Sequence, residues 1–341
     1  MKKMSIKAVA EALQVSTATV SYILNGKAKE KRISNDLTER VLEFVKEHNY
    51  KPNHLAKSLR TGKTNVIGLM VEDIADPFFA NVAGNIENIA YENGYKIIYS
   101  STKNDTQKAK ELIKTFQDRN VDGYIITPTE GLEDTVNELV TSGLPVVLFD
   151  RNCSDNDNQI SFVGVDNFKG AYSAVKYLIF QGYKNIAFIT LDSAQNQMIE
   201  RLLGYERAVN EARLKSSVYK FDYLQVKKHQ IIGDIHRILE DSPQLDALFF
   251  STNYLAMSGI EVLNDRQILI GSEIGVMVFD DNDLFRIHRP SISAVNQPVY
   301  EMSKQLITTL LGHMENANMY VPQQFSLAAN LIIRDSSEKH P

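Results

Sequence analysis

The chain has 341 residues, 43% of them hydrophobic and 23% charged, so two or three packed domains are expected and disorder is not expected as the main state. Its single cysteine, Cys153, cannot form an internal disulfide or a thiolate metal cage, and no apolar stretch approaches the length that spans a bilayer. The net charge of −5 is uneven: residues 1–63 hold 13 Lys+Arg against 6 Asp+Glu, and the remainder holds 24 against 36. A basic N-terminal segment followed by an acidic remainder predicts that the N-terminal segment binds a polyanion.

Three helices are predicted within the first fifty residues, over 5–13, over 16–24 with Ser16 as N-cap, and from Ser34 onward. The second helix is expected to bury Val20, Ile23 and Leu24 and to turn Thr17, Ala18, Ser21 and Tyr22 outward. The third is expected to bury Leu37, Val41, Leu42 and Val45. Two helices joined by a tight turn, the second with short polar side chains outside, suit a DNA major groove, and a plain helical hairpin is the alternative.

Beyond residue 65, short apolar runs alternate with amphipathic stretches, which is typical of parallel sheets with helices on both faces. The predicted strands are 66–71, 97–100, 124–127, 146–149, 162–165, 186–190, 247–250 and 275–279. Ligands of such sheets bind at the carboxyl ends of the strands. The residues after these runs include carboxylates, amides, an arginine and aromatic rings, a set that suits a polar, polyol-like ligand.

Several short motifs occur in one order and at one spacing along the first 68 residues. They are the stretches 5–10, 15–21 and 24–26, then Pro52, Asn53, Ala56, Leu59, Ile67 and Gly68. In these residues the chain resembles the lac-repressor (LacI) family. The resemblance implies an N-terminal all-α helix-turn-helix domain, residues 1–60, with a hinge helix over 53–60. It further implies an α/β periplasmic-binding-protein-like domain over 61–341, made of two doubly wound parallel-sheet lobes. These lobes would be about 64–163 with 296–325, and about 164–292 with 326–341.

The same resemblance implies the roles of individual residues. Paired hinge helices would enter the minor groove, with Leu59 as the apolar wedge that opens a base step. The implied contacts with base edges are Thr17, Ala18 and Tyr22, and those near phosphates are Ser16, Thr19, Ser21, Asn25 and Ser34. The implied contacts of the hinge helix with DNA are Asn53, Ala56 and Leu59. The expected effector contacts, from family position and from strand ends, are Phe78, Phe79, Asp150, Gln195, Gln197, Arg201, Asn253 and Asp280. Phe78 and Phe79 could instead belong to the core, and Asp150 and Asp280 could instead cap turns.

Three departures from the family pattern bear on specificity. Tyr22 stands where the family often has an arginine, which removes the commonest guanine reader. The charged connection over residues 27–32 is longer than usual and is expected to meet phosphates or solvent. Tyr254 replaces the usual aspartate after Asn253. Neither the operator sequence nor the effector can therefore be copied from a relative.

Sequence motifs give no support to an enzyme. No glycine-rich nucleotide motif follows a strand, residues 271–275 lack the nucleophile-elbow spacing, and the seven histidines form no i, i+4 pair. We therefore expect no catalytic residue, cofactor or metal. The expected protein is a cytoplasmic homodimeric regulator, without a membrane partner, that binds double-stranded operator DNA under control of a carbohydrate-like effector. A free-standing sugar-binding protein and an α/β-fold enzyme are the alternatives.

Overall fold

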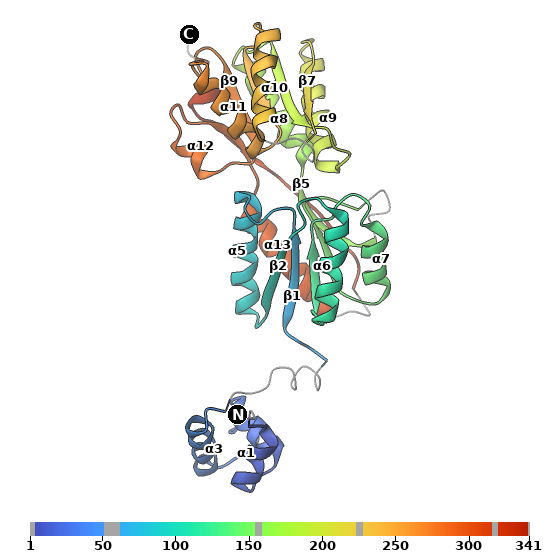
Figure 1. Ribbon diagram of the computed structural model, residues 1–341, viewed down its shortest axis with the longest axis vertical. Helices are drawn as coiled ribbons and strands as arrows, with labels where there is room; N and C mark the ends of the chain where they lie inside the picture. The colour runs from blue at the N-terminus through green and yellow to red at the C-terminus, as the bar shows by residue number, and fades with distance from the viewer. Residues whose placement is uncertain (1–3, 51–61, 154–158, 223–227, 316–319, 340–341) are drawn as a thin grey trace. The chain divides into compact units, whose positions relative to one another are not determined.

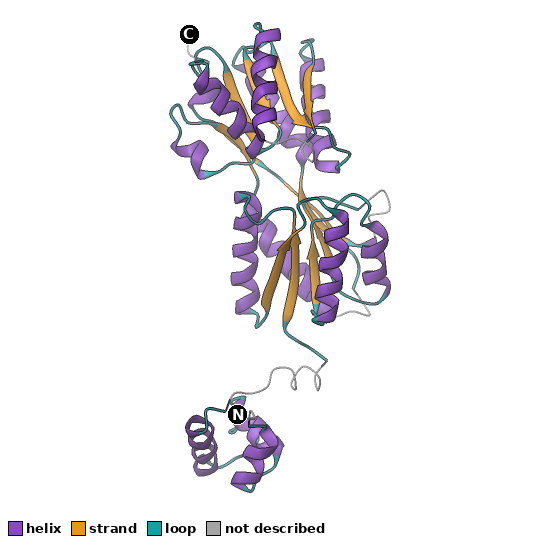
Figure 2. Ribbon diagram, in the orientation of Figure 1, coloured by secondary structure: helices purple, strands orange, loops and turns teal. Residues whose placement is uncertain are grey.

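The computed structural model describes residues 4–50, 62–153, 159–222, 228–315 and 320–339. The chain folds as two compact units, Met1–Thr64 and Asn65–Pro341. The described part of the first unit contains helices, and the second contains helices and strands (Figure 1, Figure 2). No helix among the described residues is both long and apolar enough to cross a membrane.

The first unit consists of α1 (Ile6–Leu13), α2 (Thr17–Leu24) and α3 (Asn35–Glu47), close to the three predicted helices. Each begins after a serine whose hydroxyl accepts a hydrogen bond from the backbone N–H three residues later. These N-caps are Ser5, Ser16 and Ser34, of which the last two were predicted. Each cap satisfies a backbone donor that the helix itself leaves unpaired.

A small core holds the three helices together. Val9, Val20, Ile23 and Val41 are buried in it, and Leu24, Leu37, Phe44 and Val45 pack against it. The prediction that Leu42 also faces inward was wrong, because 47% of its surface is exposed. Phe44 and Val45 follow Val41 at i+3 and i+4 and share its side of α3, whereas the next residue along a helix lies a quarter turn away.

The second unit contains two six-stranded sheets among its described residues. The first has the order β11-β5-β4-β3-β1-β2 and is parallel throughout. Its strands are β1 (Val66–Val71), β2 (Lys96–Ser101), β3 (Gly123–Ile126), β4 (Val146–Phe149), β5 (Ser161–Val165) and β11 (Gln324–Leu327). It forms the first lobe together with α5 (Pro77–Glu92), α6 (Thr106–Asp118), α7 (Glu133–Thr141) and α13 (Val299–Glu315).

The second sheet has the order β12-β10-β9-β8-β6-β7 and is parallel except for β12, which runs antiparallel to β10. Its strands are β6 (Ile186–Leu191), β7 (Ser217–Phe221), β8 (Ala247–Phe250), β9 (Gly275–Phe279), β10 (Ser293–Asn296) and β12 (Asn330–Ile332). The second lobe adds α8 (Asn167–Phe180), α9 (Asn196–Glu211), α10 (Lys228–Asp241), α11 (Asn253–Asp265), α12 (Asp283–Ile287) and the short turn η2 (Asp335–Ser337). The strands β7, β10, β11 and β12 were not among the predicted runs.

Strand alternation divides the core between the two faces of each sheet. In β1, Ile67 and Leu69 point into a cluster with α5 and α13, and Met70 points into another with α6 and α7. The first of these clusters continues into the second lobe, where it includes Phe188 and Phe279. The chain passes from the first lobe to the second after β5, returns after β10, and crosses again between β11 and β12. The two lobes are therefore linked by three crossings and by continuous packing.

The tightest helix pair of the second lobe is α8 against α9. Gly204 lies at this crossing, and a Cβ atom placed on it would stand 2.4 Å from the carbonyl oxygen of Phe168 and 2.9 Å from the backbone nitrogen of Tyr172. Both contacts are with backbone, which cannot rotate away as a side chain can. The two helices approach this closely because position 204 carries no side chain.

Gly204→Ala is expected to force α8 and α9 apart and to lower the free energy of unfolding by about 1–3 kcal/mol, the usual cost of overpacking. Thermal and denaturant unfolding followed by circular dichroism measures the change. Gly233→Ala is the matched control, since Gly233 lies in α10 with nothing within 4 Å of its added Cβ. That control should be neutral or slightly stabilising. Equal stability of Gly204→Ala and wild type would contradict the packing described here.

Candidate functional site

The outer face of α2 presents the side chains predicted to meet bases. Thr17, Ala18 and Tyr22 are exposed, whereas Val20 and Ile23, on the opposite side of the same helix, are buried. The turn before α2 is tight, with Gln14 in the left-handed region at φ 57°. A short helix with two small side chains and one aromatic ring outside can approach the floor of a DNA groove closely.

Several of the predicted phosphate contacts also hold the helices together. The Ser16 hydroxyl lies 2.8 Å from that of Thr19, in addition to capping α2. At the other end of the helix, the Asn25 side-chain amide donates to the carbonyl oxygen of Ser21 at 2.7 Å. Ser34 caps α3. Exposed hydroxyl and amide groups at helix ends are suited to phosphate oxygens, so the structural roles and a DNA role are compatible.

The long basic connection contacts the predicted recognition helix. The Lys31 ammonium lies over the ring of Tyr22, 5.4 Å from its centroid, and also pairs with Glu30. The sequence indicated only phosphates or solvent for this segment. A cation held against an exposed tyrosine restricts the ring and places positive charge beside the groove-facing surface. The predicted contacts Asn53, Ala56 and Leu59, with the rest of the hinge helix, lie outside the described residues.

All eight predicted effector contacts line one pocket of the second unit, between its two lobes. The first lobe contributes Phe78 and Phe79 from the start of α5 and Asp150 after β4. The second lobe contributes Gln195, Gln197 and Arg201 before and within α9, Asn253 at the start of α11 and Asp280 after β9. The other lining residues are Glu72, Asp76, Arg151, Leu191, Met198, Thr252, Tyr254 and Gln297.

Two aspartates occupy equivalent places in the two lobes. Asp150 follows β4 and its backbone N–H donates to Val163 of β5, while Asp280 follows β9 and its N–H donates to Val295 of β10. Both have left-handed backbone conformations, with φ 68° and 78°. Aspartate tolerates this region better than most residues. Each lobe thus extends one strand ladder by one residue and then turns the chain so that a carboxylate lines the pocket.

Arg201 is the most extensively held side chain of the pocket. Its guanidinium donates to the Asn167 side chain at 2.9 Å and to the carbonyl oxygen of Ser251 at 2.7 Å. One of its nitrogens lies 3.5 Å from a carboxylate oxygen of Asp280, and its central carbon lies 3.6 Å from the centroid of the Phe279 ring. Only 2% of the residue is exposed. Arg201 is therefore a buried residue of the pocket and not an ordinary charge on a helix surface.

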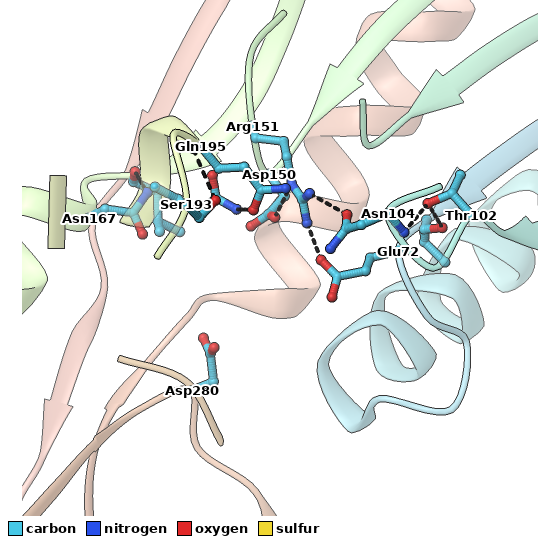
Figure 3. A network of polar contacts seen from close by, with 12 residues as sticks. Glu72, Thr102, Asn104, Asp150, Arg151, Asn167, Ser193, Gln195 and Asp280 are labelled. Carbon is cyan, nitrogen blue, oxygen red and sulfur yellow. Dashed lines mark hydrogen bonds and ion pairs between the residues drawn. The ribbon is translucent and has the colours of Figure 1, made fainter. Parts of the chain in front are cut away.

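Arg151 is the corresponding arginine of the first lobe. The sequence placed it among the residues that follow strands but did not assign it an effector contact. Its guanidinium pairs with Glu72, donates to the Asn104 side chain at 2.7 Å, and has its Nε 3.6 Å from a carboxylate oxygen of Asp150 (Figure 3). The residue is 4% exposed. An arginine directly after a predicted strand was the available signal. Its partners Glu72 and Asn104 follow different strands and could not be paired with it from sequence.

Phe78 and Phe79 belong both to the pocket lining and to the core. Their ring centroids are 5.0 Å apart, and each also packs against Phe149 at about 6 Å. Both are buried, so the sequence alternatives of core and pocket do not exclude each other. Their rings offer an apolar wall beside the charged groups. Such a wall suits the C–H face of a sugar-like ring.

Burial dominates the electrostatics of the pocket carboxylates. Desolvation, with smaller contributions from the charges of Asp280 and Glu72, raises the pKa of Asp76 to about 6 against the hydrogen bonds from Phe78 and Asn253, which lower it. Desolvation also raises the pKa values of Asp150 and Asp280, in opposition to the nearby arginines. Among these three, Asp76 alone has no arginine among the interactions that act on its pKa.

Comparison with known proteins establishes the family. Residues 5–53 match the model for bacterial regulatory proteins of the lacI family, and residues 175–337 match that for a periplasmic binding protein-like domain. The transcriptional regulator RegA of Clostridium saccharobutylicum is 32% identical over 98% of this chain and 99% of its own length. The chain belongs to the LacI family. LacI-family proteins are DNA-binding transcription regulators, so the regulator prediction is confirmed and the enzyme alternative is wrong.

Solved structures confirm the predicted fold class. The lac repressor dimer bound to operator aligns with a TM-score of 0.85 at 18% identity, over 98% of this chain and 99% of that one. The complex of the transcriptional regulator CelR with cellobiose aligns with a TM-score of 0.71 at 23% identity, over 98% of this chain and all of that one. At these identities the likeness shows the architecture alone. The contacts of this LacI-family chain must be argued from its own residues.

Asp76→Asn is expected to stabilise the protein at pH 7.5 by on the order of 1 kcal/mol, less than the full pKa change implies because the side chain is partly solvated. The folded-state pKa of about 6 lies above the ordinary value of 3.8. The penalty of the buried charge is therefore absent below pH 4, grows between pH 4 and 6, and is complete above. Asparagine keeps the N-cap of α5. Denaturant unfolding at pH 4 and 7.5 should show the variant's advantage almost entirely at the higher pH.

The control for this measurement is Asp73→Asn. Burial opposes ionisation of Asp73, but its ion pair with Lys103 and the backbone N–H of Ala75 leave its pKa lowered overall. The sign is therefore opposite, and this variant should lose stability at pH 7.5. Equal and parallel pH profiles for the two variants would contradict the assignment of the buried charge to Asp76.

Proposed function

We propose that this LacI-family regulator is a cytoplasmic homodimeric repressor that binds a near-palindromic operator through α2 and releases or recruits DNA in response to a polyol-like effector held between its lobes. The proposal rests most on one observation, that eight residues far apart in the sequence line a single pocket at the carboxyl ends of two sheets. Relatives whose structures hold operator DNA or cellobiose support it by analogy. A free-standing sugar-binding protein would not need the basic helical unit.

Two copies are required by the geometry of DNA recognition. One α2 helix can read only a few base pairs, and two half-sites about one helical turn apart give a dimer its specificity. The excess of positive charge in residues 1–63 supports binding to phosphates, and the neutral outer face of α2 supports base reading. Thr17, Ala18 and Tyr22 are the proposed base contacts. Asn53, Ala56 and Leu59 remain proposed minor-groove contacts.

The pocket in this state is too small for a sugar. Its volume is about 40 Å³, against the roughly 300–1,000 Å³ of ordinary ligand sites. The space is occupied by the protein's own pairs, Arg151 with Glu72 and Arg201 with Asp280. An effector must therefore separate the lobes or replace these pairs. Each pair lies within one lobe, so separation of the lobes is the change that alters their relation. A ligand that favours one arrangement of the lobes shifts the population of DNA-binding dimers.

Tyr22→Ala is expected to weaken specific operator binding by about tenfold to a hundredfold, the cost of losing one good base contact, with little change in nonspecific binding because no charge is lost. Duplexes selected from a random library by the wild-type protein supply the operator for gel-shift titrations at several salt concentrations. Tyr22→Phe, which removes only the hydroxyl, separates hydrogen bonding from stacking. Absence of any preferred duplex for wild-type protein at low salt would overturn the proposed function.

Arg201→Lys is expected to raise by at least about tenfold the concentration of the most active sugar needed to change operator affinity, since an ammonium cannot reproduce the fork of the guanidinium. Operator affinity without sugar should stay unchanged. The matched control is Arg207→Lys on the same helix, at an exposed position paired with Glu211. A screen of sugars against the selected operator supplies the test compound. Equal responses of both variants and wild type would remove Arg201 from the effector site.

A further inference from the structure

The pocket holds an excess of negative charge. Four carboxylates line it, Glu72, Asp76, Asp150 and Asp280, against the guanidinium groups of Arg151 and Arg201 and no lysine or histidine among the described lining residues. Glu72 pairs with Arg151 and Asp280 with Arg201. Asp150 shares Arg151 at 3.6 Å. Asp76 is left with hydrogen bonds from neutral donors alone, the backbone N–H of Phe78 at 2.8 Å and the Asn253 amide at 3.4 Å.

Carboxylates line the pocket from both lobes. Asp76 and Asp150 belong to the first lobe and Asp280 to the second, and the charge of Asp280 disfavours ionisation of both. Closing the lobes thus brings like charges together in a desolvated space. This cost is removed when a positive group stands between them. The bond from Asn253 to Asp76 crosses between the lobes, so Asp76 lies where the lobes meet.

Two further groups in the pocket lack a donor. The side-chain oxygens of Gln197 and Gln297 are buried without a hydrogen-bond partner, and each residue is 3% exposed. Both residues line the same pocket as Asp76. A buried acceptor without a donor costs on the order of 1–3 kcal/mol. The pocket therefore contains hydrogen-bond acceptors without donors, as well as more carboxylates than cationic groups.

A protonated amine supplies both a positive charge and hydrogen-bond donors. An ammonium group carries one positive charge and three donors, whereas a sugar hydroxyl carries no charge and a phosphate or carboxylate would add to the excess. A bound metal ion is the other candidate cation. Among the described residues, however, no group of three or more His, Cys, Asp or Glu side chains stands close enough together to hold one.

We propose that the effector is an amine-bearing polyol, an amino sugar or amino alditol, whose ammonium group binds at the carboxylate of Asp76. This inference rests on the proposed function. The hydroxyls of the ligand take the remaining positions beside the arginines and the phenylalanine rings. The paired side chains of the pocket must move apart before the ligand can enter, because the pocket volume is only about 40 Å³. The ammonium group then relieves the repulsion between the facing carboxylates, which favours the closed arrangement of the lobes.

The test compares matched compounds on the purified full-length protein at pH 7 by isothermal titration and thermal shift. The amines are glucosamine, galactosamine and glucamine, the neutral parents are glucose, galactose and sorbitol, and N-acetylglucosamine and gluconate complete the set. At least one amine should bind at least about tenfold more tightly than its parent, as a hydrogen bond to a charged group implies. Asp76→Asn should cut that preference to less than about threefold, because it weakens binding of the amine more than binding of the neutral parent. Asp73→Asn, outside the pocket, should leave the preference as in wild type.

Each result bears on the inference. Tighter binding of a neutral parent or gluconate, a preference that survives Asp76→Asn, or no amine bound at all would overturn it. In the first case the proposed function stands with another effector class, and in the second it stands with an amine that is held by another residue. Operator selection with the same preparation keeps the two apart: retained operator binding with no amine bound rejects only this inference, and loss of operator binding rejects the proposed function itself. A wild-type circular dichroism spectrum and a cooperative melting transition no lower than that of wild type confirm that Asp76→Asn is folded.

Discussion

The burial of two arginines at the facing edges of the two sheets constrains the rest of the second unit. Arg151 and Arg201 are almost completely inaccessible, and an unpaired buried charge costs several kcal/mol. Each must therefore keep carboxylate and carbonyl partners in fixed places. The left-handed turns at Asp150 and Asp280 supply part of this arrangement, and the strand ladders fix where those turns occur. The position of the pocket follows from satisfying these charges.

The charges of the pocket also affect how closely the two lobes approach each other. A hydrophobic cluster runs from α5 and α13 into the second lobe and resists separation, while the facing carboxylates oppose closure. The balance between these opposed terms is sensitive to a single added charge or donor. Such near-cancellation is what a ligand-controlled regulator requires, since a ligand shifts an equilibrium only by its differential affinity for the two states.

The sequence predicted most of the fold and half of the pocket. Strands with continuous apolar runs, such as β4 and β8, were located to the residue, because both faces of these strands are buried. The edge strands β7 and β12 were missed because their side chains are partly exposed and their runs mixed. Strand ends identified Asp150 and Asp280. Glu72 and Gln297 were missed because their importance depends on partners, Arg151 and Asp280, that only the fold brings to them.

In the DNA-binding unit, the residues that attract any DNA differ from the residues proposed to read its sequence. Its net positive charge acts on phosphates of any sequence, and its strength falls with salt. The outer face of α2 is neutral, so the proposed base contacts Thr17, Ala18 and Tyr22 add nothing to the nonspecific attraction. Lys31 joins the two functions by resting on the Tyr22 ring. The pocket belongs to the second unit of the chain and this surface to the first. Under the proposed function, an effector therefore leaves the chemistry of the surface unchanged and alters operator affinity by changing how two copies are placed on the duplex.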